Sequence, residues 1–283
     1  MDNRYNRLDS LYGLRSKGEG ILSTSLAPSG DHDHTRFMER LDCLMRGGLS
    51  QLLELVADPN VFTGTDIALS ETQMILEATR NGSHRDMLFD ATALIRRQYP
   101  DLPLIASSGI MNMISYGQKR FIRKCAEYGI DAVDFPRYLT IEDPIDFRHD
   151  VRNAGMYIIC PIYLDRFDLN CQEQMALLEQ VTAISEGQLF VVPGASGSTN
   201  RFDGLKYRPL IEQIRAFQQK HHIKATIICI GGITNPDNVY ELVQVAGADG
   251  IHYSSACINR FLNATPLEQV EHWLLDSKAA MAG

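Results

Sequence analysis

The stretch that decides the fold is residues 225–256, which read ATIICIGGITNPDNVYELVQVAGADGIHYSSA. It holds a short apolar run at Thr226–Ile230, a glycine turn, an amphipathic segment at Pro236–Val245 and a second apolar run at Gly250–Tyr253. Short apolar runs bounded by turn residues are typical of buried strands, and the segment between them has helical spacing. The stretch therefore predicts a strand, a helix and a second strand, with a loop of small residues after each strand.

The same unit repeats along the chain, roughly every 25 to 35 residues. The remaining apolar runs predict strands at Ile21–Leu26, Gln51–Leu55, Leu102–Ala106, Ala132–Phe135, Tyr157–Cys160 and Leu189–Val192. Amphipathic segments predict helices at Thr35–Arg46, Met87–Gln98, Gln118–Glu127, Gln172–Ile184, Leu205–Lys220 and Leu267–Ala280, with an extra N-terminal helix at Tyr5–Arg15. Strands that alternate with helices in this way predict an α/β fold, a single (β/α)8 TIM barrel domain over residues 1–283.

The main alternative is an open, doubly wound sheet. That fold usually carries a G-x-G-x-x-G turn after its first strand, where the backbone approaches a dinucleotide. Here the first turn reads Ala27-Pro28-Ser29-Gly30-Asp31, which lacks this pattern. The closed barrel is therefore the better prediction.

The composition argues against several classes of partner. The 27 Lys and Arg against 35 Asp and Glu give a net charge of −8, which disfavours nucleic acid and anionic membranes as partners. The polar N-terminus and the lack of an apolar run of about 18 residues predict no export signal or membrane anchor. The six cysteines include no C-x-x-C pair, so we expect reduced thiols in a cytoplasmic protein.

Three loops of small residues predict a site for a phosphorylated small molecule. Barrels often bind phosphate at the loops after strands seven and eight, where backbone N–H groups approach the anion. The candidate residues in these loops are Gly232, Ser254 and Ser255, and the loop after the sixth strand adds Ser196 and Gly197.

The same loops resemble the tryptophan synthase α-subunit family, whose pattern G-I-S-x-P-x-x-V is followed by A-G-A-x-G-x-x-x-G-S-A. Gly231–Val239 and Ala246–Ala256 match these two motifs, Leu53-Glu54-Leu55 resembles the family's L-E-L, and Ile159-Cys160-Pro161 its I-C-P. The resemblance extends from about residue 5 to about residue 275, and it is that of a divergent member. It implies a lyase that works with no cofactor.

The resemblance also implies two catalytic carboxylates. In the family, a glutamate at the end of strand two and an aspartate in the next loop assist the retro-aldol cleavage of indole-3-glycerol phosphate. Glu54 matches the glutamate, and Asp66 is the nearest candidate for the aspartate within Pro59–Gln73, with Asp58 as a weaker one. Such a cleavage needs a base for a hydroxyl proton and an acid for the leaving carbon. The alternative is that Glu54 is a buried structural carboxylate and Asp66 a helix cap.

Several positions that bind indole in the family have changed here. Without gaps, the family's tyrosine on strand six aligns with Gln188, an aromatic residue on the seventh loop with Gly231, and an apolar residue on strand three with Ser107. Each change removes apolar surface, whose burial contributes about 1.5–3 kcal/mol per side chain. Arg137 lies where the family has an aspartate, which suggests either a second anionic group on the substrate or a surface arginine. The changes therefore favour a more polar phosphate or phosphonate as the substrate, while cleavage of indole-3-glycerol phosphate itself in a rebuilt pocket stays open as the alternative.

The histidines offer weaker hypotheses. Asp31-His32-Asp33-His34 in the first loop alternates metal-ligand types, but without an obvious further ligand we predict no metal and favour a helix cap with solvated histidines. His252 within the eighth strand is predicted to be a hydrogen-bonded residue at the edge of the core. Two other functions stay open: a non-catalytic barrel that regulates a partner such as a pyridoxal-phosphate β-subunit, or a phosphosugar isomerase-like barrel.

Overall fold

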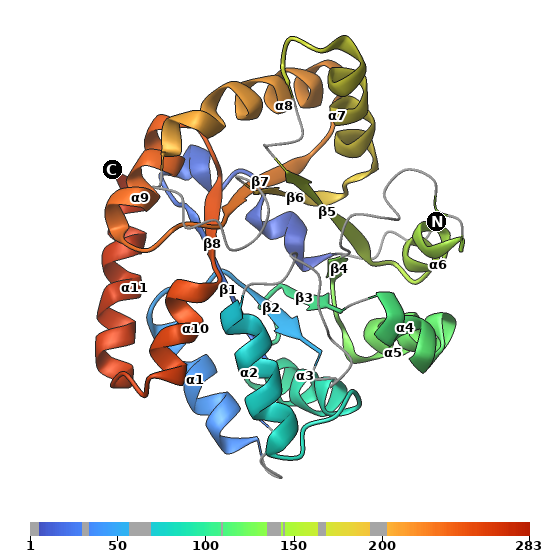
Figure 1. The fold of residues 1–283 in the computed structure, drawn as a ribbon, viewed down its shortest axis with the longest axis vertical. Coiled ribbons are helices and arrows are strands. Elements are labelled where there is room, and N and C mark those ends of the chain that lie inside the picture. The colour runs from blue at the N-terminus through green and yellow to red at the C-terminus, as the bar shows by residue number, and fades with distance from the viewer. Residues whose placement is uncertain are drawn as a thin grey trace.

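The computed structural model describes residues 6–29, 34–56, 69–108, 110–134, 143, 145–163, 168–192 and 203–283. Eight parallel strands form a closed barrel in chain order, with β8 paired to β1 (Figure 1). The strands are β1 (Ile21–Leu26), β2 (Gln51–Leu55), β3 (Leu104–Ser107), β4 (Ala132–Asp134), β5 (Tyr157–Tyr163), β6 (Gly187–Val192), β7 (Ala225–Ile230) and β8 (Gly250–Tyr253). The predicted (β/α)8 barrel is confirmed.

Helices surround the barrel, as Figure 1 shows. Those at the predicted places are α1 (Thr35–Arg46), α3 (Met87–Gln98), α5 (Gln118–Tyr128), α7 (Gln172–Ile184), α8 (Arg208–His221), α9 (Pro236–Tyr240) and α11 (Leu267–Ala282). Further helices are α2 (Leu69–Arg80), α4 (Ile110–Tyr116), α6 (Phe147–Asn153) and α10 (Ser255–Leu262). A short 3-10 helix, Gly204–Tyr207, precedes α8, and a π-helical turn, Glu241–Val245, follows α9.

Two element boundaries differ from the prediction for clear backbone reasons. The extra N-terminal helix is present as two short 3-10 helices, Arg7–Leu11 and Arg15–Lys17, because Gly13 between them has φ of +85° and interrupts helical geometry. Strand β3 begins at Leu104 instead of Leu102, directly after Pro103, which has no N–H to donate to a neighbouring strand.

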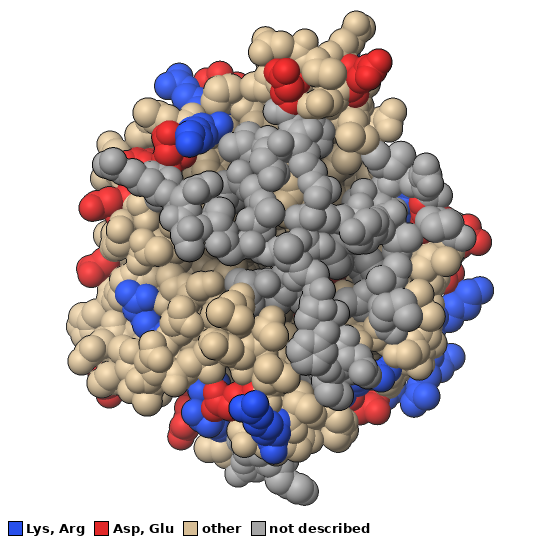
Figure 2. All heavy atoms as spheres, viewed as in Figure 1, with Lys and Arg blue, Asp and Glu red and all other residues tan. Residues whose placement is uncertain are grey.

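The core fills the space between the barrel wall and the helices. On α1, Phe37, Leu41 and Leu44 follow the spacing of one helix face and are fully buried. Many charged side chains of the described residues lie around the edge of the face shown in Figure 2. Among the described residues, no helix is both long and apolar enough to cross a membrane. Because the strands are parallel, their carboxyl ends meet at one rim, which we call the barrel mouth.

Candidate active site

The inner face of the barrel can be identified from contacts across it. His252 on β8 packs against Phe190 on β6, with ring centroids 5.7 Å apart, although β7 lies between these strands in the wall. His252 is in register with Ser23 on β1, and side chains alternate along a strand. Ser23 and Ser25 therefore face the inside, and Thr24 between them faces the helices.

Glu54 faces the helix layer. It is in register with Leu26 on β1 and Ala106 on β3, which lie on the outer side of the wall. The Thr92 hydroxyl on α3 lies 3.0 and 3.2 Å from the two carboxylate oxygens. Burial raises the pKa of Glu54 to about 8, against the lowering influence of Thr92 and Arg96. This geometry fits the structural alternative considered for Glu54 better than a role at the barrel mouth.

A carboxylate does reach the inner face at the end of β4. Asp134 is in register with Ser107 on β3, and the Ser107 hydroxyl donates a hydrogen bond to Asp134 Oδ2 at 3.2 Å. Burial raises the pKa of Asp134 to about 7, the bond from Ser107 lowers it, and the charge of Glu71 raises it further. Both side chains stay partly exposed. Asp134 can therefore occupy either protonation state near neutral pH.

A second carboxylate, Glu71, belongs to a chain of buried polar groups. Ser25 Oγ lies 3.0 Å from Glu71 Oε1 and 2.9 Å from His252 Nε2, and Ser23 Oγ lies 2.9 Å from His252 Nδ1. Burial lowers the pKa of His252 to about 3, so the imidazole is neutral at physiological pH. Glu71 lies near the start of α2, so its hydrogen bond with Ser25 connects α2 to β1.

The glycine and serine loops lie side by side, because β7 pairs with β8. Gly231 and Gly232 follow β7 with φ of +96° and +71°, a left-handed backbone that favours glycine. Ser254 and Ser255 follow β8, where Ser255 begins α10 and accepts a hydrogen bond from Ser70 Oγ at 2.9 Å. This rim therefore presents small residues and a helix start next to the first turn of α2.

Curated proteins similar to this chain are tryptophan synthase alpha chains. The protein from Cronobacter sakazakii is 26% identical over 288 residues, which cover 98% of each chain, and the one from Actinobacillus pleuropneumoniae is 27% identical over 267 residues, with 89% and 88% covered. The chain is therefore similar to tryptophan synthase alpha chains over nearly its whole length, at about a quarter of identical residues, as expected of a divergent relative. No protein-family model matches the sequence.

Solved tryptophan synthase structures share the fold of this chain. Tryptophan synthase subunit alpha from Legionella pneumophila superposes with a TM-score of 0.76 at 20% identity, covering 98% of this chain and 99% of its own. A tryptophan synthase from Mycobacterium tuberculosis superposes with a TM-score of 0.80 at 15% identity, covering 99% and 100%. At these identities the likeness supports the barrel and not its chemistry.

The family-based pocket positions fall on the inner side where they are described. Ser107 is the partner of Asp134 at the barrel mouth. Gln188 lies near the amino-terminal end of β6, at the opposite end of the barrel, where it is fully buried and in register with Thr226 on β7. Gln188 Nε2 has no hydrogen-bond partner among the described residues. Asp66, Arg137, Ser196 and Gly197 lie outside the described residues.

Of the Asp31-His32-Asp33-His34 motif, His34 belongs to the described residues. Asp31, His32 and Asp33 lie outside the described residues. The expectation of a solvated histidine is wrong for His34, because this side chain is only 5% exposed and packs at the start of α1. Among the described residues, no three His, Cys, Asp or Glu side chains are placed to hold a metal ion.

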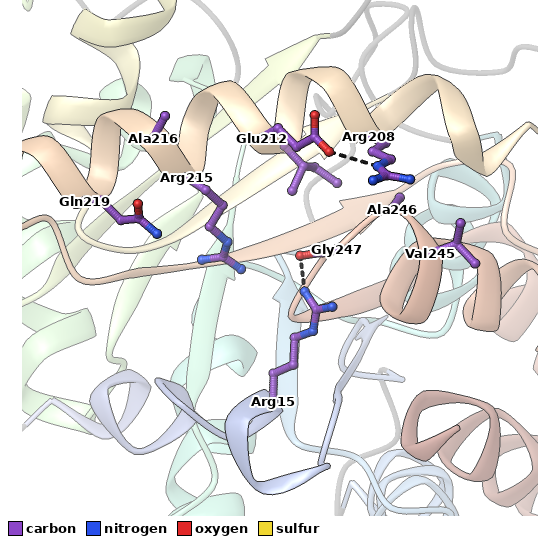
Figure 3. A pocket seen from close by; sticks show the side chains of 10 residues that line it. Arg15, Arg208, Glu212, Arg215, Ala216, Gln219, Val245, Ala246 and Gly247 are labelled. Carbon is purple, nitrogen blue, oxygen red and sulfur yellow. Dashed lines mark hydrogen bonds and ion pairs between the residues drawn. The ribbon is translucent and has the colours of Figure 1, made fainter.

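A separate pocket of about 420 Å³ lies beside the turn that leads into β8 (Figure 3). Arg208 pairs with Glu212 at 2.8 Å, and Arg215 pairs with Asp249. Arg15 donates to the carbonyl of Gly247 and so fastens the N-terminal segment to that turn. Two of the three arginines that line this pocket already pair with carboxylates, so we do not propose it as an anion site.

Proposed function

We propose that the chain is a lyase of the tryptophan synthase α type that cleaves a carbon–carbon bond in a phosphorylated substrate. The substrate is a phosphate or phosphonate more polar than indole-3-glycerol phosphate. The observation that carries this proposal is the pair formed by Ser107 and Asp134 at the barrel mouth. A carboxyl group with a pKa near neutrality is suited to proton transfer at a carbon centre.

The reaction needs two proton transfers. A base removes the proton of a substrate hydroxyl, and the oxygen lone pair forms a carbonyl as the adjacent carbon–carbon bond breaks. The electrons of that bond pass to the leaving carbon, which takes a proton from an acid. The products are a carbonyl compound and the protonated leaving fragment, so no oxidant or reductant is needed. We assign the acid to Asp134.

The geometry favours Asp134 over Glu54 for this role. The contacts of Glu54 are with α3, on the outer side of β2, whereas Asp134 belongs to the inner face. Asp66 remains a sequence-based candidate for the second catalytic carboxylate.

The phosphate group would bind at the loops after β6, β7 and β8. Backbone N–H groups near Gly232 and the start of α10 can donate to an anion, and the hydroxyls of Ser254 and Ser255 can add to them. Ser196 and Gly197 are the sequence-based candidates from the loop after β6. Ser107 would face the rest of the substrate, with Arg137 and Gly231 as further sequence-based candidates, and its hydroxyl suits a hydroxylated or charged group better than an indole ring.

The experiment is a turnover assay with indole-3-glycerol phosphate and with smaller hydroxylated phosphates and phosphonates, in which carbonyl release is measured. Asp134→Asn should lower kcat by about 100-fold or more, whereas Glu54→Gln should keep most of the activity. Asp276→Asn on α11 is the control, because it removes an exposed carboxylate. The lyase proposal fails if the wild-type chain cleaves none of these substrates. Full activity of Asp134→Asn would exclude Asp134 as the acid.

The similarity to tryptophan synthase alpha chains also supports a protein partner. We propose that the chain works with a pyridoxal-phosphate β-subunit-like protein, which would use one of the products. Addition of such a protein should raise kcat and lower the amount of free product in the same assay. A β-subunit that leaves turnover unchanged at saturating concentration would argue that the chain acts alone.

A further inference from the structure

Glu71 is the described carboxylate that α2 turns toward the barrel interior. It is 8% exposed and lies in the first turn of α2, within the segment Pro59–Gln73 in which the second family carboxylate was expected. Its Oε1 accepts a hydrogen bond from Ser25, an inward-facing residue of β1. Glu71 therefore contacts the inner side of the barrel from outside the sheet.

The direction of the hydrogen bonds around Ser25 follows from the chemistry of the carboxylate. An ionised Glu71 can only accept, so the single proton of the Ser25 hydroxyl points to Glu71. Ser25 Oγ must then accept from His252 Nε2–H, and the unprotonated Nδ1 accepts from the Ser23 hydroxyl. Because the imidazole is buried and neutral, one tautomer satisfies every member of the chain.

Two observations place Glu71 near the groups assigned to the proposed function. Its chain neighbour, Ser70, donates to Ser255 at the start of α10, where the phosphate is proposed to bind. The charge of Glu71 also acts on Asp134 across the barrel mouth. Glu71 thus lies near both the loop after β8 and the proposed acid.

We propose that Glu71 is the catalytic base of the lyase, and that Ser25 and His252 are positioning residues that hold its carboxylate in the ionised, acceptor state. This inference rests on the proposed function and names the base that it requires. In the reaction, Glu71 takes the proton of the substrate hydroxyl as the carbonyl forms, and Asp134 gives a proton to the leaving carbon. Exchange of both protons with solvent after product release restores the starting state.

The first test is a pair of substitutions on the same helix. Glu71→Gln should lower kcat by about 100-fold or more with KM changed by about threefold or less, since the amide cannot take a proton. Glu77→Gln is the matched control, because Glu77 forms a partly exposed ion pair with Arg36. It should keep activity within about twofold. Wild-type activity in Glu71→Gln would overturn the assignment.

The second test separates positioning from a structural role. Ser25→Ala removes the donor that favours ionised Glu71, so the acid limb of the pH profile of kcat/KM should move to higher pH. A merely structural serine would change the melting temperature and leave that limb where it is. An unchanged limb in a folded Ser25→Ala protein would exclude the positioning role.

The third test needs no substrate. In ¹⁵N spectra of the imidazoles, His252 should be neutral at pH 6 with its proton on Nε2, and His252→Gln should identify its signals. A proton on Nδ1, or a doubly protonated ring, would contradict the hydrogen-bond directions assigned to Ser23, His252 and Ser25, whether or not turnover is found. If the wild-type chain cleaves no phosphorylated substrate, the proposed function fails. If it does and Glu71→Gln is equally active, only the assignment of Glu71 fails.

Discussion

The Ser70 hydroxyl donates a hydrogen bond to the Ser255 hydroxyl, with the two oxygens 2.9 Å apart. This bond joins the first turn of α2 to the first turn of α10. Ser255 accepts in it, so its own proton remains available to donate to a bound anion. The bond therefore holds the loop after β8, where phosphate is proposed to bind, against the turn of α2 that carries Glu71. A substitution in one of these segments should change the position of the other.

Ser255→Asp should weaken phosphate binding. A carboxylate at the start of α10 would occupy the position proposed for the anion and repel it. We expect the dissociation constant of inorganic phosphate or of a small phosphate ester, measured by calorimetry, to rise by at least about tenfold.

Asn263→Asp is the matched control for that measurement. It adds the same charge at the exposed carboxyl-terminal end of α10, away from the loop. Phosphate affinity should change little in this variant. Equal losses in both variants would show that net charge, and not the loop, governs binding.

Ser107→Ala should move the alkaline limb of the pH profile. The hydrogen bond from Ser107 favours ionised Asp134, and its loss raises the pKa of Asp134 further above about 7. If Asp134 is the acid, it must be protonated to act, so activity should persist to higher pH by about one unit or less. The measurement is kcat between pH 6 and 9. A limb that stays in place or moves to lower pH would contradict the role of Asp134.

Glu54→Gln should change how stability depends on pH. Because the pKa of Glu54 is about 8 in the folded chain against an ordinary value of 4.5, the unfolded chain loses this proton first as pH rises. Stability should therefore fall between pH 4.5 and 8, by up to about 1.4 kcal/mol per pH unit. The glutamine variant has no proton to lose at this position. Its free energy of unfolding in urea, relative to that of the wild type, should therefore increase from pH 5 to pH 8. Parallel curves for the two proteins would contradict the raised pKa.

The barrel could be predicted because its signals are local. The boundaries of β1, β2 and β8, and of α1, α3 and α7, agree with the sequence because apolar period and turn residues mark them. Helix α2 was not predicted, since the candidate carboxylate loop was expected to extend into its first turn.

The candidate site was harder to predict because it depends on which side of the wall a residue faces. The L-E-L motif gives the position of Glu54 in β2 but not its direction, and a shift of one residue in strand register reverses it. Asp134 carried a readable signal, since a carboxylate at the end of a barrel strand is a frequent catalytic position. Glu71 had none, because its contact with Ser25 joins residues 46 positions apart.

Asp131→Asn should destabilise the fold strongly without altering the barrel mouth. Asp131 lies in the turn before β4, and its carboxylate accepts from Arg7 at 2.8 Å, from Arg96 at 2.8 Å and from the backbone N–H of Leu104 at 2.9 Å. The Asp131 side chain is 3% exposed, so the neutral amide would leave Arg96, which is 13% exposed, without its counterion. Removal of one partner of a buried pair costs about 3–5 kcal/mol.

Arg7→Ala is the comparison for that variant, because Arg7 is 28% exposed and Asp131 keeps its bond to Arg96. Its loss should cost about 1 kcal/mol or less. Urea unfolding followed by circular dichroism measures both variants under the same conditions. A loss in Asp131→Asn no greater than in Arg7→Ala would mean that Arg96 is satisfied by the carbonyls of Gly129 and Leu102 alone.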